Sequence, residues 1–174
     1  MEIRELLADA PRPGRLCWIG LRRSKRGAVD EVVEVEALEG LGLAGDRKAT
    51  GAPRPQGKRH VTLIQREHLA VVGALLDREP VDPALLRRNL VVEGINLRAL
   101  RDRRFTIGEA VLEGTGECHP CSRMEETLGR GGYQAMRGHG GLTARVVASG
   151  PLRVGDEVVL LPESDDPDLA GVPG

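Results

Sequence analysis

Aromatic side chains are almost missing from this sequence, which has one Trp, one Tyr and one Phe, or 2% of its residues. Proteins that bind single-stranded nucleic acid stack bases on such side chains, so their scarcity argues against that class. An excess of one charge is missing too, because 25 basic and 26 acidic residues leave a formal net charge of −1. We therefore expect no nucleic-acid partner held by a bulk positive field, although a local basic pocket is compatible with this composition.

Long hydrophobic runs are missing as well. No segment of the sequence approaches the roughly 18 apolar residues that a membrane-spanning helix needs. The first residues, MEIRELLADAPRPG, include acids and lack the apolar run of a signal peptide. Three cysteines are too few, and odd in number, for the disulfide framework of a small secreted protein. We therefore expect a cytoplasmic protein without a membrane partner, in which a close pair of cysteines is reactive or binds a metal.

The length of 174 residues suits one domain. We expect this domain to cover residues 1–162 and to be followed by a mobile acidic tail, residues 163–174. Short apolar stretches predict strands over 15–21, 29–37, 60–65, 89–92, 110–114, 142–148 and 157–161. Residues 40–58 are rich in Gly and Pro and predict a long irregular loop, which in a compact domain often has a function.

Few helices are predicted. One spans residues 66–76, where apolar residues recur every three or four positions, and residues 96–100 suit a single helical turn. Another begins at Asp82, a favoured N-cap residue, and a third begins at Ser122, which forms a capping-box pattern with Glu125. The fold class is therefore mainly β with short helices. A mostly antiparallel β-barrel with helices in its connections fits this pattern better than alternating βαβ units.

The segment Cys118-His119-Pro120-Cys121 is the first place to look for chemistry, and four interpretations compete for it. Cys118, Cys121 and His139 together would supply three ligands to zinc. The two cysteines would alternatively form a redox pair of the thioredoxin type, although the expected βαβ context is missing. They would also serve as small buried hydrophobic residues. The fourth interpretation is a thiolate directed into a pocket.

Local physics favours the thiolate at Cys121. Its sulfur lies near the positive end of the expected helix, and Arg123 adds a cationic neighbour. Cys118 lies at the end of a strand without these supports, and is either a resolving thiol or an incidental neighbour. Cys17 falls inside the apolar run LCWIGL and is most simply a core residue. We therefore expect Cys121 to be the functional cysteine.

Several arginines outside this turn suit the recognition of a phosphate or a pterin, because a planar guanidinium donates paired hydrogen bonds. They lie in or beside Gly-rich or turn-forming segments, where the backbone can approach a ligand closely. Each of them alone is more simply a solvated surface charge, and the Gly cluster around His139 is more simply a turn. The candidate binding residues are Asp46, Arg47, Arg88, Asn89, His139 and Arg145.

Taken in order, six sequence blocks resemble a known family. They are GDR at 45–47, RRN at 87–89, IGEAVLEGT at 107–115, PC at 120–121, GHGGLTARV at 138–146 and VGDEV at 154–158. Single blocks are unspecific, but their order over residues 29–161 resembles a small stand-alone bacterial MOSC domain. This module is named after the C-terminal part of molybdenum cofactor sulfurases.

The resemblance implies a β-rich barrel with a pocket around Cys121. Family members are linked to molybdenum cofactor, either as sulfur carriers for metal–sulfur centres or as reductases of N-hydroxylated compounds. Cys121 would accordingly hold a persulfide sulfur or ligate molybdenum in a molybdopterin-type cofactor. The partner would be a sulfur donor or acceptor protein, or a small N-hydroxylated substrate. Asp46, Arg47, Arg88 and Asn89 match the family blocks as pocket residues.

The amidoxime-reducing members of the family have an extra N-terminal β-barrel domain, for which the residues before Val29 leave no room. A non-catalytic module that binds a cofactor or docks a partner protein is therefore the rival function, and the oligomeric state is left open. In either case Arg47, Arg88 and Asn89 are predicted to converge with Cys121 at the mouth of the barrel, where distant loops meet.

Overall fold

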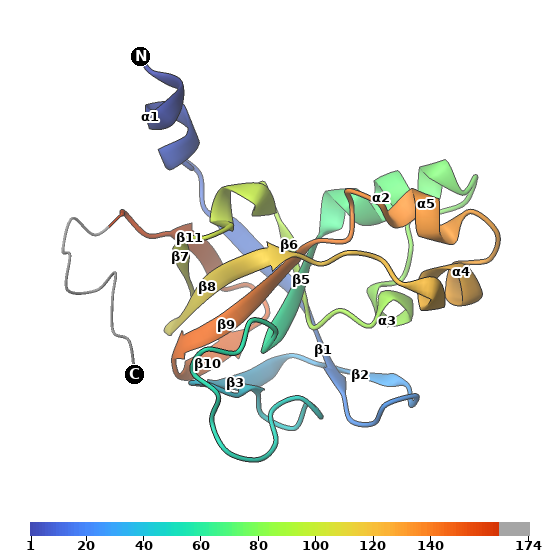
Figure 1. Ribbon diagram of the computed structural model, residues 1–174, viewed down its shortest axis with the longest axis horizontal. Helices are drawn as coiled ribbons and strands as arrows, with labels where there is room; N and C mark the ends of the chain where they lie inside the picture. Colours follow the sequence, from blue (N-terminus) through green and yellow to red (C-terminus); the bar gives the residue numbers. More distant parts are fainter. Residues whose placement is uncertain (164–174) are drawn as a thin grey trace.

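The computed structural model describes residues 1–163, and its centre is a closed mixed barrel of seven strands with short helices outside it (Figure 1). The barrel strands are β1 (Gly14–Arg22), β5 (Val61–Gln65), β6 (Leu90–Glu93), β7 (Arg104–Ile107), β8 (Ala110–Glu117), β9 (Leu142–Ala148) and β11 (Glu157–Leu160). They follow the order β11-β7-β8-β9-β5-β6-β1, and pairing of β1 with β11 closes the ring. Only the β5–β6 pair among these is parallel. The predicted, mostly antiparallel barrel is confirmed; the predicted tail, apart from Glu163, lies outside the described residues.

One predicted strand is in fact two. Residues 29–37 divide into β2 (Val29–Val32), which extends the barrel sheet beside β1, and β3 (Glu34–Leu38), which belongs to a second sheet. That small sheet also contains β4 (Gly42–Leu43) and β10 (Gly150–Arg153). The prediction of a single strand was wrong because Val32 and Val33 are adjacent, which shifts the alternation of apolar residues by one position. Val33 is left 76% exposed at the break.

The helices lie mostly in the connections, as predicted. They are α1 (Ile3–Ala8), α2 (Arg66–Leu75), α3 (Pro83–Leu86), the 3-10 helix η1 (Leu97–Leu100), α4 (Ser122–Leu128) and α5 (Gly132–Met136). The Asp82 side chain accepts a hydrogen bond from the Ala84 N–H at 2.9 Å, which confirms the predicted cap. Among the described residues, no helix has both the length and the apolar character to cross a membrane.

The capping box predicted at Ser122 and Glu125 is wrong. Cys121 is the N-cap residue of α4, and Ser122 is already inside the helix. The Glu125 carboxylate instead accepts hydrogen bonds from the backbone N–H groups of Gly131 and Tyr133, at 2.8 and 2.9 Å. These two bonds lower the pKa of Glu125. Glu125 therefore stabilises the connection between α4 and α5 rather than the start of α4.

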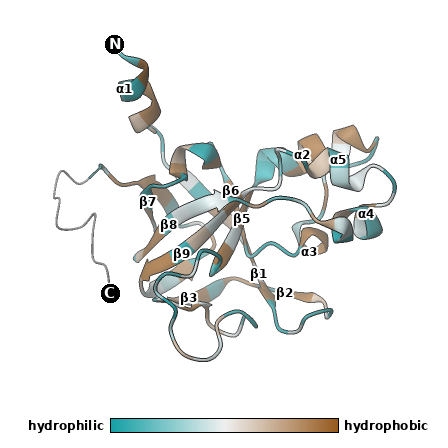
Figure 2. Cartoon of the chain, in the orientation of Figure 1, coloured by the Kyte–Doolittle hydropathy of each residue, from teal (hydrophilic) through white to brown (hydrophobic). Residues whose placement is uncertain are grey.

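Two hydrophobic cores position the site. The larger one fills the barrel and contains Phe105, Leu16 and Leu112, all fully buried. The second lies outside the barrel, where α2, α3, α4 and α5 pack on β5 and β6, and it contains Leu86 and Met136. In Figure 2 hydrophobic segments mark both the barrel strands and these helices. The segment that carries Cys118 and Cys121 crosses from the barrel to this helical layer (Figure 1).

Candidate functional site

The two cysteines of the candidate turn have different surroundings. Cys118 directly follows β8, is 2% exposed, and donates its backbone N–H to the Gly141 carbonyl at 2.8 Å. Cys121 is exposed at the N-cap position of α4, and its side chain makes no capping hydrogen bond. Cys17, the third cysteine, donates to the Val91 carbonyl, and burial raises its pKa to about 11. Cys121 is therefore the accessible thiol of this turn, and Cys118 is covered.

Two guanidinium groups approach the covered thiol. Arg59 donates from Nη2 to the Cys118 sulfur at 3.4 Å. Arg88 is 6% exposed, and it donates from Nε to the Gly140 carbonyl at 2.9 Å and from Nη1 to the Leu86 carbonyl at 2.8 Å. Its Nη2 atom has no hydrogen-bond partner within residues 1–163. Burial lowers the pKa of Arg88, and Cys118 and Cys121 act on it in the opposite direction.

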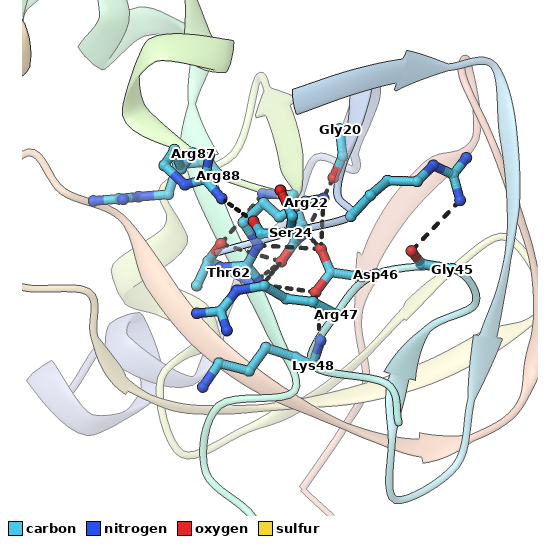
Figure 3. Close-up of polar contacts among 12 residues, drawn as sticks. Gly20, Arg22, Ser24, Gly45, Asp46, Arg47, Lys48, Thr62, Arg87 and Arg88 are labelled. Atoms are coloured by element: carbon cyan, nitrogen blue, oxygen red, sulfur yellow. Dashed lines mark hydrogen bonds and ion pairs between the residues drawn. The ribbon is translucent and has the colours of Figure 1, made fainter. Parts of the chain in front are cut away.

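A buried polar network supports the neighbouring loop (Figure 3). The Asp46 carboxylate, 1% exposed, accepts hydrogen bonds from the Arg22 backbone and side chain at 2.9 to 3.2 Å, and from Asn89 Nδ2 at 2.9 Å. Asn89, fully buried, also donates to the Gly20 carbonyl, and its Oδ1 accepts from Arg22 and from the Thr62 N–H. Burial alone would raise the pKa of Asp46, but the hydrogen bonds from Arg22 outweigh it and lower that pKa.

Cationic side chains extend from the loop that this network supports. The Lys48 N–H donates to Asp46 at 3.0 Å, and Arg47 and Lys48 extend from the same loop (Figure 3). Burial lowers the pKa of Lys48, and the positive charge of Arg47 lowers it further. Burial and the charge of Arg123 likewise lower the pKa of Arg87, whose guanidinium donates to backbone carbonyls of the β1–β2 loop.

These cations form one group, which we call the basic cluster. In addition to burial, the positive charges of neighbouring cations lower the pKa values of Lys48, Arg87 and Arg88, so these charges repel one another. Its members are Arg22, Arg47, Lys48, Arg54, Arg59, Arg87, Arg88 and Arg123. Mutual repulsion of this kind is relieved when an anion binds. Arg59 of the cluster donates to the Cys118 sulfur, and Arg123 follows Cys121 by two residues. The cluster therefore suits an anion that reacts with sulfur or carries a metal bound by sulfur.

The structure brings some of the predicted site residues together. Asn89 donates to Asp46 at 2.9 Å, which brings the segments of Arg47 and Arg88 together, whereas their convergence with Cys121 stays a prediction. The hydrogen bonds of Asp46 and Asn89 are made within the buried polar network, so these two residues hold the loop and strand that present the cations. Their direct contact with a cofactor stays a prediction.

His139 and Arg145 have other neighbours. His139 Nδ1 lies 2.9 Å from the Ala135 carbonyl, and its ring packs edge-on against His68 with 5.1 Å between centroids. Arg145 donates to the Gln56 side chain at 3.2 Å and lies 3.4 Å from Glu113. Neither His139 nor Arg145 is among the charged groups that cause the pKa shift of Arg88. Their role in binding a cofactor stays a prediction without contacts to the thiols.

Five residues of the network and the basic cluster were missed by sequence reasoning: Arg22, Lys48, Arg54, Arg59 and Thr62. Arg22 opens the basic turn RRSKRG, and Lys48 directly follows the GDR block, so two of them had a weak signal. Arg59 had no signal, because an isolated arginine before a strand resembles any surface charge. Within the described part of the chain, no group of three His, Cys, Asp or Glu side chains is arranged to hold a metal ion. The zinc interpretation therefore has no geometric support there.

Comparison with known proteins agrees with this architecture. The family model described as "MOSC domain" matches residues 46–159. The YuaD protein of Bacillus subtilis superposes with a TM-score of 0.74 at 18% identity, covering 88% of this chain and 98% of that one. YiiM of Escherichia coli gives a TM-score of 0.65 at 21% identity, covering 87% of this chain and 72% of that one.

A third solved structure, YiiM of Geobacillus stearothermophilus, gives a TM-score of 0.67 at 16% identity, covering 88% of this chain and 77% of that one. At such low identities these likenesses concern the fold. No curated protein matches the sequence.

Proposed function

Because the chain belongs to the MOSC domain family, we propose that it is a sulfur-handling protein in which Cys121 accepts a sulfur atom and passes it to a metal–sulfur centre. The observation that supports this proposal is the exposed thiol of Cys121 at the start of α4, beside the basic cluster. A helix N-terminus and cationic neighbours stabilise a thiolate, and a thiolate is the nucleophile of sulfur transfer.

The loading step needs one sulfur donor and no oxidant. The Cys121 thiolate attacks the outer sulfur of a persulfide on a donor protein or a small molecule. A new S–S bond forms at Cys121, the S–S bond of the donor breaks, and the donor leaves as a thiolate. The basic cluster stabilises the anionic persulfide that results, and buried Arg88 contributes an N–H that has no partner within residues 1–163. The acceptor is a protein or cofactor that takes this sulfur into a metal centre.

A second candidate function uses the same residues to bind a molybdenum–pterin cofactor. The donor set fits this group, since Arg47, Lys48, Arg87 and Arg123 offer cations to a phosphate and Cys121 offers a thiolate to the metal. The unpaired Nη2 of buried Arg88 also fits an anionic ligand. When bound, the cofactor would supply redox chemistry toward a small N-hydroxylated substrate, and the protein would orient it.

One purification separates these candidates. The protein is purified from cells that make molybdenum cofactor, and cyanide-labile sulfur, molybdenum and zinc are measured per chain. The protein is also assayed directly after incubation with a persulfide donor, when we expect labile sulfur in the native protein and in Cys17→Ser but none in Cys121→Ser. Molybdenum together with pterin fluorescence would instead support the cofactor-binding function. If neither sulfur nor molybdenum depends on Cys121, the proposal is wrong and a docking module becomes the better hypothesis.

A further inference from the structure

A covered thiol that the proposed function leaves unused lies three residues before Cys121. Cys118 is 2% exposed and is held by its backbone bond to Gly141. Gly140 also packs against the Cys118 carbonyl so closely that a β-carbon on Gly140 would overlap it. The turn therefore holds the Cys118 thiol in a buried position and leaves the Cys121 thiol accessible to a sulfur donor. Two intervening residues are the spacing found in Cys-x-x-Cys oxidoreductases.

Two guanidinium groups, those of Arg59 and Arg88, lie beside the segments that hold the covered thiol. Arg59 donates to the Cys118 sulfur at 3.4 Å. Arg88 is 6% exposed, and within residues 1–163 its Nη2 has no partner. A buried polar N–H without a partner is costly, so a nitrogen left in this state is expected to meet a ligand or a transient charge. Gly140 faces both this nitrogen and the Cys118 carbonyl, so the nitrogen lies beside the segment of the covered thiol.

We infer that Cys118 is the resolving thiol for sulfur carried on Cys121, and that Arg59 and Arg88 stabilise the anionic sulfur during this step. The inference rests on the proposed function, because it starts from Cys121 persulfide. Its ligand is the persulfide itself, and its product is hydrosulfide, so the protein releases sulfur in a form that a metal centre can take up.

The step is balanced without an external oxidant. The Cys118 thiolate attacks the inner sulfur of the Cys121 persulfide. A disulfide bond forms between Cys118 and Cys121, the bond to the outer sulfur breaks, and that sulfur leaves as hydrosulfide. The outer sulfur gains two electrons, and the two cysteines together lose two. A cellular dithiol then reduces the disulfide and returns both thiols to their starting state.

The test follows one loaded protein over time. The full chain is loaded with sodium polysulfide, freed of excess reagent, and analysed by peptide mass spectrometry while released sulfide is measured. In the native protein we expect the persulfide on Cys121 to decay, with one sulfide released for each Cys118–Cys121 disulfide formed. In Cys118→Ser the persulfide should persist and the release of sulfide should be lost. Cys17→Ser is the matched cysteine control and should behave as the native protein does.

Arginine variants separate a positioning role from a general structural one. For each loaded Cys121 persulfide, Arg59→Gln should release sulfide more slowly than the native protein does, and Arg59→Lys should restore part of that rate. The inference is overturned if the native protein and Cys118→Ser lose persulfide at the same rate, or if no disulfide forms after loading.

Failure of the proposed function would look different, since Cys121 would then take up no sulfur even in Cys118→Ser. In that case oxidation with glutathione disulfide decides whether the pair can form at all. A pair that forms no disulfide overturns the inference independently.

Discussion

At the scale of single residues, Asp46 is the anion on which the geometry of the basic cluster depends. It neutralises Arg22, whose side chain is only 10% exposed, and it anchors the backbone N–H of Lys48. Loss of one partner of a buried pair leaves the other charged group without compensation, which is far more costly than loss of an exposed pair. The acid of the GDR block is thus a support for the cations that follow it.

We expect Asp46→Asn to lower the free energy of unfolding at pH 7 by about 3 to 5 kcal/mol, because Arg22 remains buried without its counter-charge. Asp30→Asn is the matched control, since Asp30 pairs with Arg23 at 2.7 Å but is about half exposed. That change should cost less than about 1 kcal/mol. Urea unfolding of both variants measures the difference, and equal losses would contradict the assignment.

The pH dependence of this pair has a definite sign. The folded state lowers the pKa of Asp46, so the carboxylate stabilises the protein above the unfolded-state pKa of about 3.9. That stabilisation is lost as the pH falls from about 4 through the lowered folded-state pKa. The difference between native protein and Asp46→Asn should therefore be constant near neutral pH and should narrow under acid. A difference independent of pH down to complete acid unfolding would be inconsistent with an ionised Asp46.

Sequence motifs identified part of the candidate site, and the remainder was missed because it depends on contacts between distant residues and on burial. Cys121, Arg47 and Arg88 were found because they fall in recognisable blocks. Arg59 approaches Cys118 from a position 59 residues away, and no local pattern marks an arginine whose partner is that distant. The position of Arg88 was predicted, but its burial was not, because arginine is rarely covered by protein.

At the scale of elements, the close backbone approach around Gly140 and Gly141 sets the position of Cys118. A β-carbon on Gly140 would overlap the Cys118 carbonyl oxygen, and one on Gly141 would overlap the Leu63 carbonyl oxygen. These glycines therefore serve packing of the segment before β9 against the ends of β8 and β5. Gly138 differs, since its surroundings are open although its φ is +77°.

Gly140→Ala and Gly138→Ala should accordingly behave differently. We expect Gly140→Ala to cost about 2 to 3 kcal/mol or more, because backbone must move to admit the new methyl group, and to impair sulfur loading by displacing the turn. In Gly138→Ala the new methyl group has free space, so the only cost is the strain of a left-handed backbone, about 1 kcal/mol. This variant should take up sulfur on Cys121 as the native protein does. Thermal unfolding and the polysulfide assay measure both effects. Similar losses in the two variants would show that packing against Cys118 is unimportant.

Long, clearly patterned elements were predicted well, and short ones were not. The strand over 142–148 and the cap at Asp82 were found because alternation and capping chemistry are local signals. Two-residue β4 and five-residue α5 are too short to show a period, and tertiary contacts define them. Glu125 misled the capping prediction because a glutamate accepts backbone N–H bonds equally well from the following connection.

At the scale of the whole molecule, the barrel and its helical layer should differ in local stability. Strands of a closed barrel are hydrogen-bonded on both sides, whereas α4 and α5 are seven and five residues long and depend on packing for their stability. We expect amides of α4 and α5 to exchange with solvent faster than those of β8 and β9. Hydrogen-exchange mass spectrometry measures this order. Equal protection would indicate that the two cores unfold as one cooperative unit.

The pairing of β1 with β11 also bears on how the chain folds during its synthesis. Gly14 and Arg15 lie opposite Val158 and Glu157, so the first barrel strand meets the last only after nearly all of the described chain has been made. Until then Gly14 and Arg15, at the start of β1, have no partner strand in the place that β11 takes, whereas Ile19 to Arg22 already pair with β2. A chain that ended before residue 157 would therefore have an open barrel with an unpaired strand edge, the kind of edge at which chains associate.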